Sequence, residues 1–125
     1  MSTGSEKLLN WLNNEVRLSK QLSNLEEEFA NGYHLGELLH TFELITSFSE
    51  FKNSNDKDVV YHNYYHLDQA LRNLNIPFST ETSNKVQSKK KDQISQILFL
   101  VKMYIEDHKI SLENLKLKKC NYNTL

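Results

Sequence analysis

Apolar residues recur three and four positions apart along most of the chain, which is the spacing of one face of an α-helix. The clearest case is a stripe of five residues: Val60, Tyr64, Leu67, Leu71 and Leu74. This stripe predicts a helix that begins near residue 60 and faces a core. The helix is expected to end at Ile76, because the proline that follows disfavours helical geometry in the residue before it.

The same spacing predicts further helices in the first part of the chain. Long helices are expected over residues 4–17 and 33–45, and a shorter helix is expected within residues 22–30. Thr3 and Glu6 have the spacing of a capping box, so they are expected to begin the first helix.

The last long helix is expected over residues 91–108. Its centre, residues 97–101, is apolar on all sides, which in a small protein is typical of the most buried helix. We therefore expect this helix to lie in the middle of the fold. Leu112 and Leu115 predict one more short helix after it.

Two connections lack a helical period. Residues 46–58 are rich in Ser, Asn and Asp and are expected to form a surface loop anchored by Phe48 and Phe51. Residues 79–91 are expected to be a polar connection with a short turn around Val86.

Two glycines interrupt the segment NGYHLGELLHTF, residues 31–42. An interior glycine destabilises a helix by about 1 kcal/mol relative to alanine, so each needs a reason. We expect Gly32 to take the left-handed conformation that ends the preceding short helix. We expect Gly36 to let the backbone of another helix approach closely.

The composition favours one globular, all-α domain. The chain has 125 residues, of which 38% are apolar and 25% charged, with a single proline. At this length one core is expected. The prediction is a compact bundle of four main helices plus short helices in residues 1–110. Residues 111–125 are expected to form a short helix and a flexible tail.

The cysteine and the apolar segments indicate the compartment. The single cysteine, Cys120, has no partner for an internal disulfide, which fits a reducing intracellular environment. The N-terminal sequence lacks an apolar core of signal-peptide length, and the apolar segment ILFLVKMYI is interrupted by Lys102 and too short to span a bilayer. Neither secretion nor membrane insertion is expected.

The net charge of −1 hides an uneven distribution. Residues 1–60 contain five basic and ten acidic residues, whereas residues 61–125 contain ten and six, so the two halves carry −5 and +4. The molecule is expected to be electrically two-sided. A basic face suits an acidic protein, a phosphate backbone or an anionic membrane, although charges on helices are commonly only solvated.

The sharpest charged feature is the run SKKKD at residues 88–92. The lysines of this part of the chain are the candidate contacts for an acidic partner: Lys85, Lys89, Lys90, Lys91 and Lys102. The alternative is a solvated helix start. A nucleic-acid partner is not expected, because aromatic residues are not interleaved with the lysines and the domain is not basic overall.

No arrangement of residues predicts catalysis or a cofactor. His62 and His66 have the i, i+4 spacing of two metal ligands, but the glutamate of a zinc-peptidase motif and a third ligand are missing from the pattern, so no metal is expected. No serine or cysteine lies in an activating motif, and the three glycines form no phosphate loop. The chain is not expected to be an enzyme.

Several segments carry a family resemblance by their order along the chain. They are LLNWLNNEV, FANGYHLGELLHTFELI, FSEF, LRNLNIPF and ILFLVKMYI. In this order they resemble the calponin homology (CH) domain, in the divergent type of sperm flagellar protein 2 and related proteins of the ciliary central apparatus. The resemblance covers about residues 5–108.

The resemblance implies a compact all-α domain with a central last helix and a binding function without catalysis. CH domains bind microtubules or actin, or dock other axonemal proteins. Actin binding usually uses two such domains in tandem and this chain has room for one, so actin is not expected. The resemblance therefore implies a structural adaptor of the cytoskeleton, in the axoneme of a cilium or flagellum and in its central apparatus. The lysines named above would contact tubulin or neighbouring projection proteins.

Two alternatives remain open. The first is a pure protein–protein docking module that uses the aromatic residues Phe48, Phe51 and Tyr61. The second is a small nucleic-acid-binding protein that uses the lysines. Because the central apparatus relatives are much longer, the chain is expected to be either a stand-alone version or the N-terminal module of a larger assembly.

Overall fold

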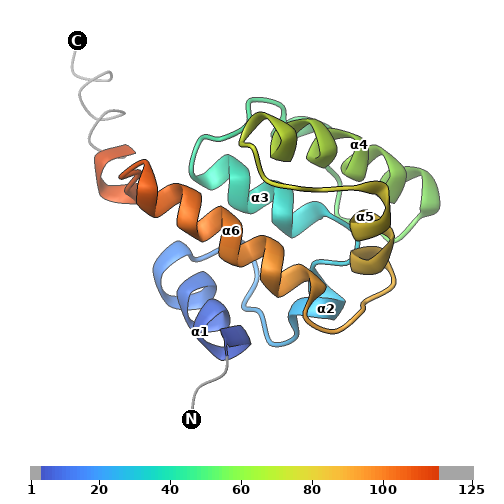
Figure 1. Ribbon diagram of the computed structural model, residues 1–125, viewed down its shortest axis with the longest axis horizontal. Coiled ribbons are helices and arrows are strands. Elements are labelled where there is room, and N and C mark those ends of the chain that lie inside the picture. Colours follow the sequence, from blue (N-terminus) through green and yellow to red (C-terminus); the bar gives the residue numbers. More distant parts are fainter. Residues whose placement is uncertain (1–3, 116–125) are drawn as a thin grey trace.

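A computed structural model describes residues 4–115, and within that range all regular secondary structure is helical (Figure 1). The predicted all-α fold is confirmed. The elements, in chain order, are α1 (Gly4–Asn10), η1 (Trp11–Val16), α2 (Leu25–Glu28), α3 (Tyr33–Thr41), η2 (Phe48–Glu50), α4 (Lys57–Asn73), α5 (Thr80–Gln87) and α6 (Gln93–Asp107).

Helix α6 crosses the middle of the domain, as predicted. It contacts α1, α2 and α5, and in Figure 1 it separates the blue α1 from the cyan α3 and green α4. Helix α3 in turn packs against α4. The core therefore lies between α6 and the helices on either side of it.

The apolar centre of α6 is buried on one side only. Ile97, Leu98 and Val101 are buried, whereas Phe99 is 55% and Met103 41% exposed. The expectation that apolar residues all round this helix mean burial all round is therefore wrong, because neighbouring helices cover only part of its circumference. No helix within residues 4–115 is long and apolar enough to cross a membrane.

The first predicted helix forms over nearly its full length, and its second half is π-helical. The amide of Arg17 donates to the carbonyl of Leu12 at 2.8 Å, and Arg17 ends the helix with φ at 59°. Trp11 and Leu12 are both buried in the core. Thr3, the predicted cap, lies outside the described residues.

Gly32 has the predicted left-handed conformation, but it lies at the start of α3 and not at the end of α2. Its φ is 88°, but α2 already ends at Glu28, and Gly32 directly precedes α3. A Cβ at Gly32 would lie 3.1 Å from atoms of both Leu67 and Tyr64 on α4. Gly32 therefore begins α3 and allows α4 to approach, so its predicted role as the end of the short helix is wrong.

Gly36 allows a close approach, but the neighbour is not the predicted helix backbone. A Cβ at Gly36 would lie 2.5 Å from the Cδ2 atom of Phe51 and 2.9 Å from its Cγ atom. Both Gly36 and Phe51 are buried. Because Cγ joins the ring to its own Cβ, ring rotation cannot relieve this contact. Gly36 forms a notch that receives the aromatic anchor of the loop after η2.

The ends of α3 and α4 differ from the predicted bounds because of capping. Helix α3 stops at Thr41 instead of residue 45: Glu43 adopts a φ of 57°, and the amide of Leu44 donates to the carbonyl of Leu39 at 2.8 Å. Helix α4 begins at Lys57, earlier than predicted, because the side chain of Asp56 accepts a hydrogen bond from the amide of Asp58.

Helix α5 occupies the segment that was predicted to be a polar connection with a short turn. Ser79 caps it by accepting a hydrogen bond from the amide of Thr82 at 3.1 Å, and Val86 is only 2% exposed. One deeply buried residue is too little to produce a periodic signal. After α6, residues 112–115 form the predicted short helix, and the rest of the tail lies outside the described residues. The proposed boundary at residue 110 stays a prediction.

The side chain of Asn63 connects α4 to two loops. It is fully buried, and its amide donates to the carbonyls of Asn31 and Lys52, both at 2.9 Å. Its Oδ1 atom accepts from the amide of Lys52 at 3.1 Å. The side chain thus fixes the turn before α3 and the loop after η2 on the same helix, with every polar atom paired.

The notch predicts a specific pattern of instability. Gly36→Leu should lower the free energy of unfolding by about 1–3 kcal/mol, because the added atoms meet the ring of Phe51. Gly36→Ala should act in the same direction, and its effect should shrink in a Phe51→Ala background. Thermal and urea unfolding measure these differences. Gly4→Ala is the matched control, since a Cβ at Gly4 has no atom within 4 Å. An unchanged melting temperature for Gly36→Leu would contradict the assignment.

Candidate partner-binding surface

A groove of about 860 Å³ lies between α4 and the segment that contains α5. Tyr61 and Tyr65 line it from α4, and Ser83 and Gln87 line it from α5. Lys89, in the loop after α5, also lines the groove. The groove therefore combines aromatic side chains with a cation.

The two groove tyrosines on α4 are unusually exposed. Tyr61 is 77% and Tyr65 54% exposed, and they are four residues apart, so they lie on the same side of the helix. Tyr64 forms a fixed wall: its hydroxyl donates to the carbonyl of Ala30 at 2.9 Å, and its ring stacks on Phe78. Burial raises the pKa of the Tyr64 hydroxyl above its ordinary value.

The structure changes the set of aromatic residues that can contact a partner. Phe51 is buried and Phe48 is partly buried against the core, so the prediction that they are exposed docking residues is wrong. Tyr61 is exposed as predicted, and Tyr65 joins it. The spacing of Tyr61 and Tyr65 in YHNYYH was the signal for this pair. The two histidines and one asparagine in the same segment are also polar, so the sequence did not show which face of the helix points outward.

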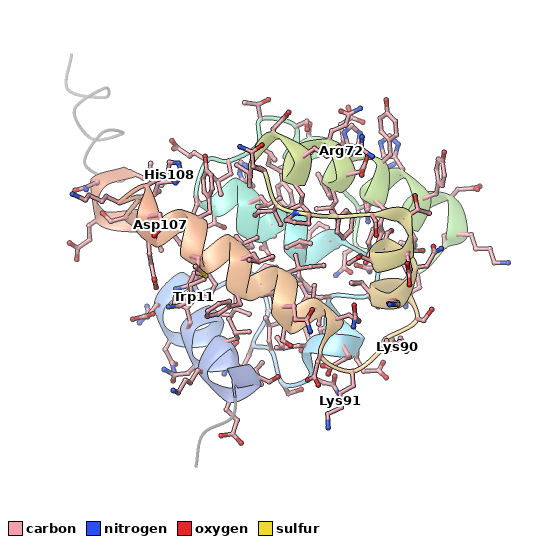
Figure 2. The ribbon with its side chains drawn as sticks, viewed as in Figure 1. Trp11, Arg72, Lys90, Lys91, Asp107 and His108 are labelled. Carbon is pink, nitrogen blue, oxygen red and sulfur yellow. The ribbon has the colours of Figure 1, made fainter. Side chains whose placement is uncertain are left out.

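The loop between α5 and α6 holds three of the five candidate lysines. Lys89 lies at the groove, where its Nζ atom is 3.0 Å from Oε2 of Glu27. Lys90 and Lys91 are exposed, and neither makes an ion pair with another residue in the range 4–115 (Figure 2). Their charges are therefore available to a partner.

The other two candidate lysines lie elsewhere. Lys85 on α5 pairs with Glu81 at 3.1 Å. Lys102 pairs with Glu106 and lies 5.6 Å from the centre of the Trp11 ring. It is nine residues from the start of α6, or about 14 Å along the helix axis. The predicted five-lysine surface is thus concentrated in the loop that holds Lys89, Lys90 and Lys91, and Lys102 lies over Trp11 of η1.

The acidic and basic halves of the chain meet where the loop between α5 and α6 contacts α2. Glu27 on α2 and Lys89 are 62 residues apart in sequence and form an ion pair. A smaller hollow of about 440 Å³ beside them is lined by Glu26, Glu27, Lys89 and Lys91. The expected separation into an acidic and a basic side does not hold here, because folding places α2 against the loop before α6.

Glu28, next to this contact, is a structural carboxylate. Its Oε1 atom is 2.8 Å from Nζ of Lys20, and its Oε2 atom accepts from the amides of Ser23 and Asn24 at 2.8 and 3.1 Å. Burial alone would raise the pKa of Glu28, but these hydrogen bonds and the charge of Lys20 outweigh burial and lower it. Glu28 therefore caps the start of α2.

A second cluster lies on the outer side of α4. His62 and His66 point to the same place, and Glu50 from η2 joins them, with the three ligand atoms within 4.8 Å of one another. The inference that a third ligand is missing is wrong. Glu50 is twelve residues from His62 and in a different element, so no local sequence pattern could have revealed it.

Comparison with known proteins shows consistent similarity over most of the chain. Residues 8–103 match the family described as CH-like domain in sperm protein. The chain is 31% identical to sperm flagellar protein 2 of Homo sapiens over 109 residues, which is 86% of this chain and 6% of that protein. It is 30% identical to sperm flagellar protein 2 of Mus musculus over 107 residues, which is 84% of this chain and 6% of that protein. The chain spans about 6% of the length of these curated relatives. No solved structure matches it.

The environment of Glu28 predicts a pH-dependent stability difference. Glu28→Gln should lower the free energy of unfolding at pH 7 by about 1–2 kcal/mol, because three donors lose a charged acceptor. The folded-state pKa lies below the ordinary value of 4.5, so the stabilisation is complete above that value and is lost as the pH falls through the folded-state pKa. Urea unfolding from pH 7 to pH 3 should show the gap closing. Glu26→Gln is the control, and a gap that stays constant with pH would contradict the prediction.

Proposed function

This chain belongs to the family of CH-like domains in sperm proteins, and from that membership we propose that it is a non-catalytic structural adaptor of the ciliary or flagellar axoneme. It binds microtubules or neighbouring proteins of the central apparatus through its single CH-like domain. The location follows from the relatives, whose name describes a sperm flagellar protein.

The exposed lysines of the α5–α6 loop are the observation that supports microtubule binding. Lys90 and Lys91 are exposed and form no ion pair within the described part of the chain. Adjacent positive charges on an exposed loop attract an acidic surface such as that of tubulin. Each contact adds a modest attraction that salt screens. Lys85, Lys89 and Lys102 contribute less, because each already faces a carboxylate.

Co-sedimentation with microtubules tests this proposal. Reversing both free charges, with Lys90→Glu and Lys91→Glu together, should weaken binding at low salt by at least about tenfold, because attraction becomes repulsion. Binding of the unaltered chain should also fall steeply as salt increases. The matched control is Lys52→Glu with Lys109→Glu, which changes the net charge equally at two exposed positions outside the loop.

The control variant separates an effect of the α5–α6 loop from an effect of net charge alone. Figure 2 shows Lys90 and Lys91 at one end of α6 and His108, the neighbour of Lys109, at the other. Equal losses in the two double variants would mean that only net charge matters. No binding by the unaltered chain at low salt, or full binding by the loop variant, would rule out direct tubulin contact through these lysines.

The groove supports a second candidate function, a docking site for a helix of another axonemal protein. Tyr61 and Tyr65 expose large aromatic surface beside a groove, which is the arrangement of a helix-in-groove interface. In sedimentation with demembranated axonemes, Tyr61→Ala with Tyr65→Ala should then lower binding by at least about tenfold, with little dependence on salt. Phe99→Ala on α6, another exposed aromatic residue, is the control. Unchanged binding of the tyrosine variant would exclude this site.

A further inference from the structure

The cluster of Glu50, His62 and His66 has the composition and spacing of a metal site. The Oε2 atom of Glu50 is 3.2 Å from Nε2 of His62, and Nε2 of His62 is 3.3 Å from Nε2 of His66. Three potential ligand atoms thus converge on one point from two elements, η2 and α4.

The fold brings this carboxylate to the histidines through two anchors next to it in sequence. Phe51, the residue after Glu50, is inserted into the notch at Gly36. Lys52 is held by two hydrogen bonds between its backbone and the side chain of Asn63, the residue after His62. Both sides of the cluster are therefore fixed by buried contacts within two residues of the ligands.

These two bonds are 3.1 Å long at the amide of Lys52 and 2.9 Å at its carbonyl, and another hydrogen bond ties the turn at Asn31 to the same side chain. The loop that carries Glu50 consequently cannot move away from α4 without leaving a buried amide unpaired, which is unfavourable. The backbone that carries Glu50 is therefore held beside α4 without an ion.

The spacing suits a tetrahedral ion. Ligands that bind Zn²⁺ at 2.0–2.1 Å in a tetrahedron lie about 3.3 Å from one another. The Glu50–His62 and His62–His66 separations, 3.2 and 3.3 Å, agree with that value, and all three atoms lie within 4.8 Å of one another. The side chains of His62 and Glu50 are 48% and 55% exposed, so an ion and a water ligand have access from solvent.

We propose that Glu50, His62 and His66 form a zinc site with one position left for water. Imidazole nitrogen with a single carboxylate favours Zn²⁺ over Mg²⁺ or Ca²⁺, which prefer sets of oxygen ligands. The ion cross-links η2 to α4 and so strengthens the attachment of the loop that carries Phe51. This site is separate from the groove and the lysine loop, and the inference does not depend on the proposed function.

Zinc titration of the untagged chain by calorimetry tests the site, with Cys120→Ser introduced so that its thiol does not compete. One equivalent of ZnCl2 should bind. His62→Ala, His66→Ala and the isosteric Glu50→Gln should each weaken binding by at least about tenfold, because each removes one ligand. His108→Ala, an exposed histidine at the end of α6, should leave the affinity unchanged. Circular dichroism verifies that each variant keeps its helices.

Thermal unfolding gives the second measurement. Zinc should raise the melting temperature of the unaltered chain and leave that of His62→Ala unchanged, because an ion that binds only the folded state stabilises it. Magnesium chloride at the same concentration should have no such effect. The proposal is overturned if the unaltered chain does not bind zinc, if the three ligand variants bind it as tightly, or if His108→Ala abolishes binding.

Discussion

The buried side-chain amide of Asn63 is the interaction on which the rest of the structure most directly depends. It bonds to the carbonyl of Asn31 and to both backbone groups of Lys52, and it is fully buried. A buried polar group without its partner costs about 1–3 kcal/mol, so the three groups hold one another in place. Two loops that flank α3 and α4 are consequently fastened to a single point on α4.

Both surface features described above are built on that point. The turn at Asn31 leads into Gly32 and places the carbonyl of Ala30 where it accepts the hydroxyl hydrogen of Tyr64, which forms a wall of the groove. The loop at Lys52 seats Phe51 against Gly36 and carries Glu50 to the histidines of α4. One buried hydrogen-bond network therefore helps to position both the groove and the proposed zinc site.

The helices were predictable where apolar residues repeat many times. They were less predictable where a helix depends on a single buried residue or cap. The stripe that ends at Leu74 and the apolar run of α6 each identify a helix, because several buried side chains must share one face. Helix α5 has one buried residue, Val86, and depends on the cap at Ser79. Its sequence therefore has no apolar repeat that would predict a helix. In the candidate site, the lysine loop was visible as a charge run, whereas the separation of Lys102 from it was not, because that depends on which side of α6 faces Trp11.

The amino-acid sequence alone determined the helical class, the CH-like order of segments and the places where glycine is needed, since these depend on periodicity and local backbone geometry. The tertiary structure decided what each of those places faces. Gly36 receives an aromatic ring instead of a helix, the predicted loop anchor Phe51 supplies that ring, and Glu50 completes a set of potential ligands with His62 and His66. Each of these depends on contacts between residues far apart along the chain, and such contacts exist only once the loops are packed against α4.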